Sequence, residues 1–113
     1  MRDNIKNRIM IVKTFDVKVK DFITSLEKPT YAKVSRTIIL LRTFGNRLRM
    51  PYSKSLGNNL FELRVRGQRE IRIFYTFYNG EAILLHAFIK KTQNTPFREI
   101  ESAKIKLKAL TKI

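Results

Sequence analysis

The chain has 113 residues, of which 24 are lysine or arginine and nine are aspartate or glutamate, so its formal net charge is +15. Hydrophobic residues at 43% and charged residues at 29% are typical of a globular protein and exclude a disordered chain. The absence of cysteine excludes disulfides, thiolate metal sites and cysteine nucleophiles. The positive charge favours a polyanionic partner, with nucleic acid ahead of an acidic protein or an anionic membrane surface. The length predicts a single domain over residues 1–113.

The N-terminal segment begins with polar residues 1–7, which we expect to be frayed, and continues with a short apolar run over residues 9–12, which predicts a first strand. Lys13 and Asp16 break the apolar run that follows the basic start. The segment is therefore neither a signal peptide nor a membrane span.

Two helices are predicted next. Thr14 or Asp16 caps the first helix, and Pro29 ends it. Thr30 then caps a second helix, whose last turn Gly45 loosens or terminates. Apolar residues recur at helical spacing in both, and we interpret these stripes as core faces packed on a sheet. They are Val19, Phe22, Ile23 and Leu26 in the first helix, and Tyr31, Val34, Ile38, Leu41 and Leu48 in the second.

Residues 48–59 carry Pro51 and Gly57 and are predicted to form a loop. This loop is expected to bring three side chains near the start of the sheet, namely Arg49, Tyr52 and Lys54.

Residues 60–91 are predicted to form three consecutive antiparallel strands. Phe61, Leu63 and Val65 alternate with polar residues, which is the period of a half-buried strand. The third run is apolar throughout, as expected of a central strand covered on both faces.

The second hairpin of this sheet turns at Asn79-Gly80, a dipeptide typical of a two-residue type I′ turn. Counting back from that turn places Arg72 opposite Ala87.

For the first hairpin, two loop lengths are possible. A two-residue loop places Arg64 beside Ile71, whereas a three-residue loop over residues 67–69, with Gly67 at a bulge or other positive-φ position, places Arg64 opposite Arg72. We choose the longer loop because it makes one face consistently apolar. That predicted core face contains Phe61, Leu63, Val65, Ile71, Ile73, Tyr75, Phe77, Leu84, His86 and Phe88.

The opposite face then carries Arg64, Arg66, Arg72 and Lys91. Like charges facing each other reduce stability, so a row of arginines without carboxylates predicts a bound anion. A merely soluble surface is the competing interpretation.

After the strands, Thr95 is predicted to cap a last helix with Pro96 in its first turn. Its apolar stripe contains Phe97, Ile100, Ala103, Leu107 and Leu110, and lysines cover much of the rest.

The residue inventory narrows the chemistry. No paired-carboxylate or histidine spacing points to a metal-dependent hydrolase, and His86 is interpreted as a satisfied structural residue. Arg64 and Arg72 suit a phosphate, and stabilise charge that grows on its oxygens. Proton transfer is assigned to one of three lysines, and base stacking to exposed aromatic residues. The candidate lysines are Lys54, Lys90 and Lys91, and the candidate aromatic residues are Tyr52, Phe74 and Tyr78. The same residues also suit a protein that only binds RNA.

Four ordered motifs, MPYSKSLG, LFELR, RIFY and HAFIKKTQNTP, together with a final amphipathic helix, resemble the RelE/HigB toxin superfamily, most closely its phage-derived HigB-type branch. The likeness covers about residues 30–108. It implies an α+β RelE-like toxin fold, with a small antiparallel sheet, two N-terminal helices packed on it and a C-terminal helix. It implies a cytoplasmic type II toxin that enters the ribosomal A site and cleaves mRNA by metal-independent attack of the 2′-hydroxyl, without a cofactor or a membrane. The partner would be an antitoxin with a helix-turn-helix domain.

Mapped onto this sequence, the resemblance places Arg64 in LFELR, Arg72 in RIFY and the pair Lys90-Lys91 at the end of the last strand. We predict Arg64, Arg72 and Lys91 as catalytic residues. The residues predicted to bind RNA or phosphate are Arg49, Lys54, Arg66, Lys90, Tyr52 and Phe74, and no metal ligand is expected. Glu62 stands where some relatives place a lysine, so a lysine general base is not transferred to that position. A non-catalytic basic RNA-binding or ribosome-associated protein is the alternative function.

Overall fold

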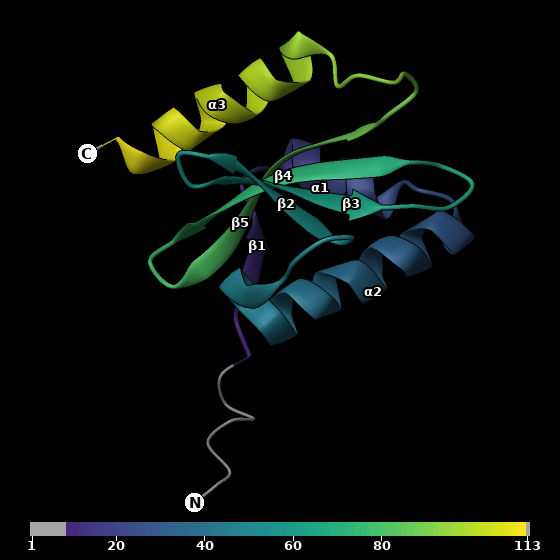
Figure 1. The fold of residues 1–113 in the computed structure, drawn as a ribbon, viewed down its shortest axis with the longest axis horizontal. Coiled ribbons are helices and arrows are strands. Elements are labelled where there is room, and N and C mark those ends of the chain that lie inside the picture. Colours follow the sequence, from purple (N-terminus) through teal and green to yellow (C-terminus); the bar gives the residue numbers. More distant parts are fainter. Residues whose placement is uncertain (1–8, 113) are drawn as a thin grey trace, which may run out of the picture.

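A computed structural model describes residues 9–112, in which helices cover both faces of a five-stranded sheet (Figure 1). The strand order is β1-β5-β4-β3-β2. The expectation that residues 1–7 are frayed lies outside the described residues. The elements in chain order are β1 (Val12–Thr14), α1 (Val17–Thr24), α2 (Lys28–Phe44), a 3₁₀ turn η2 (Gly45–Arg47), β2 (Ser53–Gly57), β3 (Leu60–Val65), β4 (Ile71–Tyr78), β5 (Glu81–Ile89) and α3 (Phe97–Thr111).

The sheet is mixed. β1 runs parallel to β5, whereas all the other neighbouring pairs are antiparallel. The α+β prediction is confirmed, and the arrangement is consistent with a RelE-like toxin fold. The predicted antiparallel pairing holds from β2 to β5, and β1 adds one parallel pair with β5 at the edge of the sheet. The first strand also lies later than predicted, at Val12–Thr14 rather than residues 9–12.

The two N-terminal helices form largely where the apolar stripes predict them. Asp16 caps α1 by accepting a hydrogen bond from the Val19 amide at 3.0 Å. Pro29 does not end α1, however, because it lies in the first turn of α2, where a missing N–H costs no helical bond. Thr30 is therefore a buried residue of α2 rather than its cap. Gly45 ends α2 with a φ of 55°, a conformation that glycine adopts without strain.

β2 lies within residues 48–59, which were expected to be a loop. It is a short edge strand in which only Ser53 is buried. Its sequence has no alternation of apolar and polar residues, so the sequence pattern does not predict a strand here. The extended conformation of β2 instead comes with its pairing to β3.

The first hairpin has the predicted register. Arg64 pairs with Arg72, and Val65 pairs with Ile71. The positive φ expected at Gly67 is wrong, because positive φ values fall elsewhere. At the second turn, Asn79 and Gly80 have φ values of 52° and 76°, as a type I′ turn requires.

A β-bulge in β5 changes the register of the second hairpin. Phe74 pairs with His86 and Tyr75 with Leu84, so one extra residue lies in β5 between the two pairs. Arg72 consequently pairs with Phe88 rather than Ala87. The same shift moves His86 and Phe88 from the predicted core face to the face covered by α3.

Two apolar clusters result, one on each side of the sheet. α1 and α2 pack on the first face, and α3 packs on the second (Figure 1). The first cluster contains Val19, Ile23, Val34, Leu41, Leu63, Val65, Ile71, Ile73, Tyr75, Ala82, Leu84 and Ala87, and the second contains Leu60, Phe74, Ile83, Leu85, Phe88 and Ala103. The central position of β5 and its coverage on both faces are as predicted.

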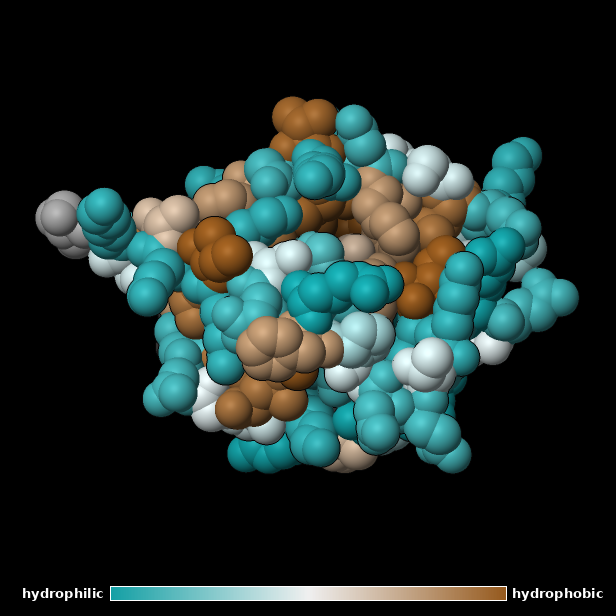
Figure 2. All heavy atoms as spheres, turned by 90° about the horizontal axis from the view of Figure 1, so that it is seen from above, coloured by the Kyte–Doolittle hydropathy of each residue, from teal (hydrophilic) through white to brown (hydrophobic). Residues whose placement is uncertain are grey.

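The last helix begins one residue after Pro96, and Thr95 does not cap it, since no side chain caps this end. Phe97, the first residue of the predicted apolar stripe, is 74% exposed. The outer side of α3 is mostly hydrophilic, with hydrophobic residues in separate patches (Figure 2). None of the helices within residues 9–112 combines the length and the apolar character that a membrane span needs.

Candidate functional site

A surface hollow of about 600 Å³, here called the arginine pocket, opens on the face of the sheet opposite α2. Arg64 comes from β3, Arg72 from β4, and Lys91 from the segment just after β5. The structure therefore brings the three predicted catalytic residues to one place. The full lining is Glu62, Arg64, Arg66, Glu70, Arg72, Lys90, Lys91, Thr92, Gln93, Asn94 and Thr95.

Glu62 lies between the two central arginines. Its carboxylate accepts a hydrogen bond from Nε of Arg64 at 3.0 Å, and its other oxygen lies 3.7 Å from Nε of Arg72. Glu62 is buried, so solvent screens these charges only weakly. The Glu62 carboxylate thus holds Arg64 of β3 and Arg72 of β4 side by side despite their like charges.

Glu70 extends this ion-pair network toward the hairpin turn. One of its carboxylate oxygens lies 3.5 Å from Nη2 of Arg72 and 3.7 Å from Nη1 of Arg66. The expectation of arginines without carboxylates is therefore wrong. The sequence explains why the two carboxylates lie among the arginines. Glu62 is two positions before Arg64, and Glu70 is two positions before Arg72. Residues two apart in a strand point to the same face of the sheet.

Arg72 is the most enclosed of the cations, with 5% of its surface exposed. Burial lowers the pKa of its guanidinium below the usual value, and the charges of Glu62 and Glu70 oppose that shift. Among the described residues, Nε and Nη1 of Arg72 have no hydrogen-bond partner. Both atoms are enclosed, so Arg72 would act on an anionic ligand in the pocket through its charge rather than through these two donors.

The two lysines at the end of β5 have different surroundings. Lys90 donates from Nζ to the carbonyl oxygens of Thr92 at 2.5 Å and Gln93 at 2.6 Å. It thereby holds the loop that forms one wall of the pocket. Lys91 is exposed and lines the same pocket, which leaves its ammonium available to a ligand.

Other predicted RNA-binding residues are spread around this centre. Arg66 is exposed at the rim of the pocket. Lys54 is exposed and is the partner of Glu62 in the pairing of β2 with β3, although it does not line the pocket. Arg49 is exposed and donates from Nη1 to the carbonyl oxygen of Asn46 at 3.1 Å, also outside the lining.

The three aromatic residues considered for base stacking do not share one site. Tyr52 is 43% exposed and lines a different hollow, beside α2. Phe74 has no exposed surface, because it packs in the core beneath α3. The prediction that Phe74 stacks a base is therefore wrong. Tyr78 also packs against that core and is half-buried.

His86 has a structural environment. Its Nε2 lies 2.6 Å from Oε1 of Glu99, which connects β5 to α3. Its ring stacks near the rings of Phe74 and Phe88. This agrees with a satisfied structural histidine, although on the opposite face from the one predicted. Over residues 9–112, no three histidine, aspartate or glutamate side chains gather closely enough to hold a metal ion.

Comparison with known proteins assigns the family. Residues 21–108 match the model of the family described as phage-derived protein Gp49-like (DUF891). No curated protein matches the chain. The matched range extends from α1 into α3 and includes all residues of the arginine pocket. The chain therefore belongs to the phage-derived Gp49-like family, which is a family of type II toxin–antitoxin toxins of the RelE-like type.

Proposed function

We propose that this protein is the toxin of a type II toxin–antitoxin system and that it cleaves mRNA in the ribosomal A site. The observation that carries the proposal is the convergence of Arg64, Arg72 and Lys91, from three parts of the chain, on one polar pocket of about 600 Å³. Family membership supports the toxin assignment. The net charge of +15 supports a polyanionic substrate.

The proposed reaction uses a nucleophile that RNA itself supplies. The 2′-oxygen attacks the adjacent phosphorus while its proton passes to a solvent water, and the bond from phosphorus to the 5′-oxygen breaks. The departing 5′-oxygen takes up a proton, which leaves a 2′,3′-cyclic phosphate and a 5′-hydroxyl. Atoms and charge balance without a metal or a cofactor. The protein must hold the phosphate, stabilise the added negative charge and move protons.

Each residue has a role that follows from its surroundings. Arg64, with a side chain 17% exposed, reaches the phosphate directly, while Glu62 fixes the plane of its guanidinium. Arg72 acts from a buried position, where its charge is screened less than it would be in water. Lys91 transfers a proton to the leaving oxygen. Lys90 is bound to its loop, so it positions the pocket wall rather than moving protons.

The wider surface would hold the RNA strand on either side of the scissile phosphate. Arg66 lies at the rim of the pocket, while Lys54 and Arg49 are exposed outside it. These cations contribute affinity that does not depend on sequence. In this proposal the partners are the ribosome, translated mRNA and a helix-turn-helix antitoxin. The protein would act in the cytoplasm, where translated mRNA is found.

The test is expression of the protein in an active translation system, with mRNA fragments mapped by primer extension. Arg64→Ala and Lys91→Ala should each reduce the cleavage rate about 100-fold, the scale expected for loss of one group that stabilises transition-state charge or of one general acid. Arg98→Ala is the control, since its side chain is 84% exposed on α3 and does not line the pocket. If the Arg64 and Lys91 variants are folded and cleave as fast as the Arg98 variant, the proposed site is wrong.

A second candidate is a basic RNA-binding or ribosome-associated protein without catalytic activity. The ion pairs of Glu62 and Glu70 favour it, because they already neutralise part of the charge on Arg64 and Arg72. This candidate predicts binding that weakens steeply with salt and no cleaved product. The same primer-extension experiment separates the two functions.

A further inference from the structure

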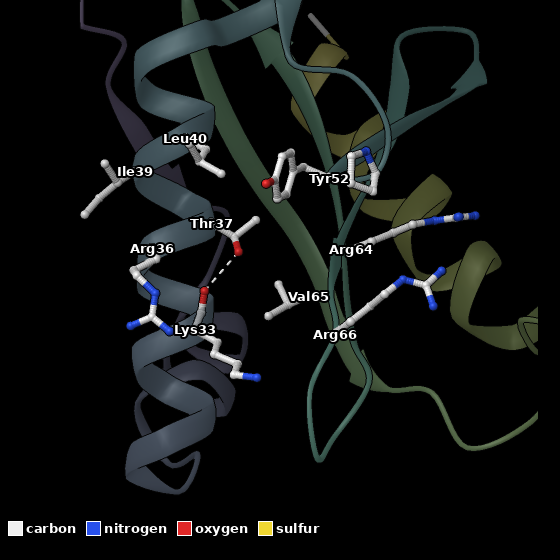
Figure 3. A pocket seen from close by; sticks show the side chains of 10 residues that line it. Lys33, Arg36, Thr37, Ile39, Leu40, Tyr52, Arg64, Val65 and Arg66 are labelled. Carbon is white, nitrogen blue, oxygen red and sulfur yellow. Dashed lines mark hydrogen bonds between the residues drawn. The ribbon is translucent and has the colours of Figure 1, made fainter.

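A second hollow of about 600 Å³ lies on the other side of β3, between α2 and the edge of the sheet (Figure 3). We call it the α2 groove. Its lining residues are Lys33, Arg36, Thr37, Ile39, Leu40, Pro51, Tyr52, Arg64, Val65 and Arg66. Four of the ten are cations, and no acidic residue occurs among these lining residues.

The groove combines an apolar floor with an exposed aromatic ring. Figure 3 shows Tyr52 pointing from the sheet side toward Leu40 of α2, and Val65, further from Leu40, also pointing toward the helix. Pro51, the residue before Tyr52, also lines the groove. An apolar slot with an accessible ring is suited to a flat nucleobase, which stacks on aromatic side chains in single-stranded nucleic acids.

Cations on α2 provide the charge that the phosphates of such a strand need. Lys33 extends from α2 toward the β3–β4 hairpin (Figure 3), where its Nζ lies 2.9 Å from the place that a Cβ on Gly67 would take. Arg36 is exposed one turn further along the helix. Neither Lys33 nor Arg36 forms a salt bridge with another of the described residues. Their charges are thus not neutralised locally, in contrast to those of Arg64 and Arg72.

The groove and the arginine pocket share a boundary. Arg64 and Arg66 line both hollows, and Figure 3 shows their side chains extending away from α2, whereas Val65 between them points toward it. The Arg64 amide donates a hydrogen bond to the carbonyl oxygen of Tyr52 at 2.8 Å. This bond fixes the Tyr52 backbone beside the residue that is proposed to hold the scissile phosphate.

From this continuity we propose that the α2 groove is a nucleotide-binding subsite for single-stranded RNA. A strand held at the arginine pocket crosses the edge of β3 at Arg66 and places one flanking base against Tyr52. The neighbouring phosphate is bound by Lys33 and Arg36. This inference rests on the proposed function, since it extends the path of the same substrate. An acidic protein segment would also suit the charge, but the continuity with the phosphate pocket favours RNA.

The experiment compares two uncleavable 2′-O-methylated RNAs, a dinucleotide and a hexanucleotide, bound to the full chain at low salt and followed by fluorescence anisotropy. The dinucleotide fills only the arginine pocket, whereas the hexanucleotide also reaches the groove. Tyr52→Ala should weaken hexanucleotide binding about tenfold, a typical effect of losing one base stack, and leave the dinucleotide unchanged. Tyr52→Phe, which keeps the ring, should bind both RNAs like the wild-type protein.

Charge-matched variants control for the general electrostatic attraction. Arg36→Ala should weaken hexanucleotide binding more than Arg42→Ala, which removes the same charge from α2 but lies at a different hollow. Equal effects of the two variants, together with normal binding by Tyr52→Ala, would overturn the subsite. If the groove variants bind RNA normally but escape neutralisation by an antitoxin, the groove is a protein-docking surface and the nucleotide assignment is wrong.

The same binding experiment distinguishes a failure of the proposed function from a failure of the α2 groove as a subsite. Lys91→Ala should weaken both RNAs, because it removes a cation of the arginine pocket and leaves the groove intact. If Lys91→Ala has no effect on the dinucleotide while Tyr52→Ala weakens the hexanucleotide, the phosphate site is misplaced and the groove still binds a base. If neither RNA binds at low salt, both proposals are wrong.

Discussion

Arg64 and Arg72 are direct partners in the pairing of β3 with β4, and one buried carboxylate, that of Glu62, lies against both guanidinium groups. Like charges opposite each other in a sheet are destabilising, so this pairing depends on its counter-ion. The arrangement keeps two cations on one face without a bound ligand. It also places an anion where a phosphate would be attracted, and an incoming phosphate must therefore share the arginines with Glu62.

The first prediction concerns this counter-ion. Glu62→Ala should lower the free energy of unfolding by roughly 3 kcal/mol, because it leaves the buried Arg72 with only its contact to Glu70. Urea unfolding followed by circular dichroism measures the change. Glu70→Ala is the matched control, since its side chain is 30% exposed and its loss should cost about 1 kcal/mol or less. An equal loss in the two variants would contradict the role assigned to Glu62.

Much of this pocket was predictable from strand periodicity. The loop chosen to make one face apolar gives the observed pairing of Arg64 with Arg72. The predicted row of arginines left out the two acidic residues on the same face, Glu62 and Glu70. Applying the same period of two to Glu62 and Glu70 identifies them without coordinates. The residues of the first hairpin turn allow either a two-residue or a three-residue loop. Only the three-residue loop leaves one face of the sheet apolar, so the pairing of Arg64 with Arg72 follows from core packing and not from the turn itself.

The second prediction concerns Phe74, which the structure places in the core rather than at the surface proposed to bind RNA. Phe74→Ala should lower the free energy of unfolding by about 3–5 kcal/mol, because it leaves a cavity beneath α3. Hexanucleotide RNA binding, measured at a temperature where the variant remains folded, should be unchanged. Weaker RNA binding by a fully folded Phe74 variant would restore the stacking role.

Local pattern did not predict the bulge in β5, and this is the main reason why the predicted faces fail. Alternation across residues 81–89 is weak, since the strand is apolar on both faces. An extra residue at Leu85 therefore leaves no mark in the hydrophobic pattern. The consequence extends to His86, whose Nε2 lies 2.6 Å from Oε1 of Glu99 on α3. Registers counted from a turn are reliable only as far as the first bulge.

The third prediction compares two glycines in the hairpin turns. Gly80→Ala should lower the free energy of unfolding by about 1–2 kcal/mol, because its φ of 76° strains any residue with a Cβ. At Gly67 φ is not positive, and an added Cβ would meet the end of the Lys33 side chain, which can move aside. Gly67→Ala should therefore stay within about 0.5 kcal/mol of wild type in a thermal melt. A larger loss at Gly67 than at Gly80 would contradict this account of the turns.

The fourth prediction is a pH dependence at the start of α1. Partial burial raises the pKa of Asp16, but the hydrogen bond from Val19 and the ion pair with Lys106 outweigh burial, and the pKa lies below its usual value of 3.8. Folding therefore favours the ionised carboxylate. Its contribution to stability is complete above the usual pKa and is lost as the pH falls through the lower folded value.

Asp16→Asn tests this dependence, because asparagine also caps helices but carries no charge for Lys106. Near neutral pH the wild-type protein should be the more stable of the two in urea unfolding. In acid below the folded pKa of Asp16, the two proteins should converge. A difference between them that stays constant over the whole acid range would show that the ion pair with Lys106 contributes nothing.

The last prediction is that naked RNA is a poor substrate. The arginine pocket is an open surface hollow whose guanidinium groups are held by carboxylates, and it contains nothing that forces a ribose and the next phosphate into line. Alignment of reacting groups contributes several kcal/mol to such reactions, and in the proposed function the ribosome supplies it. We expect cleavage of translated mRNA to be at least about 100-fold faster than cleavage of the same mRNA without ribosomes. Single-turnover rates on both substrates decide the question, with Arg64→Ala as the background. Equal rates would mean that the pocket aligns its substrate unaided, and the A site would then have no catalytic part in the reaction.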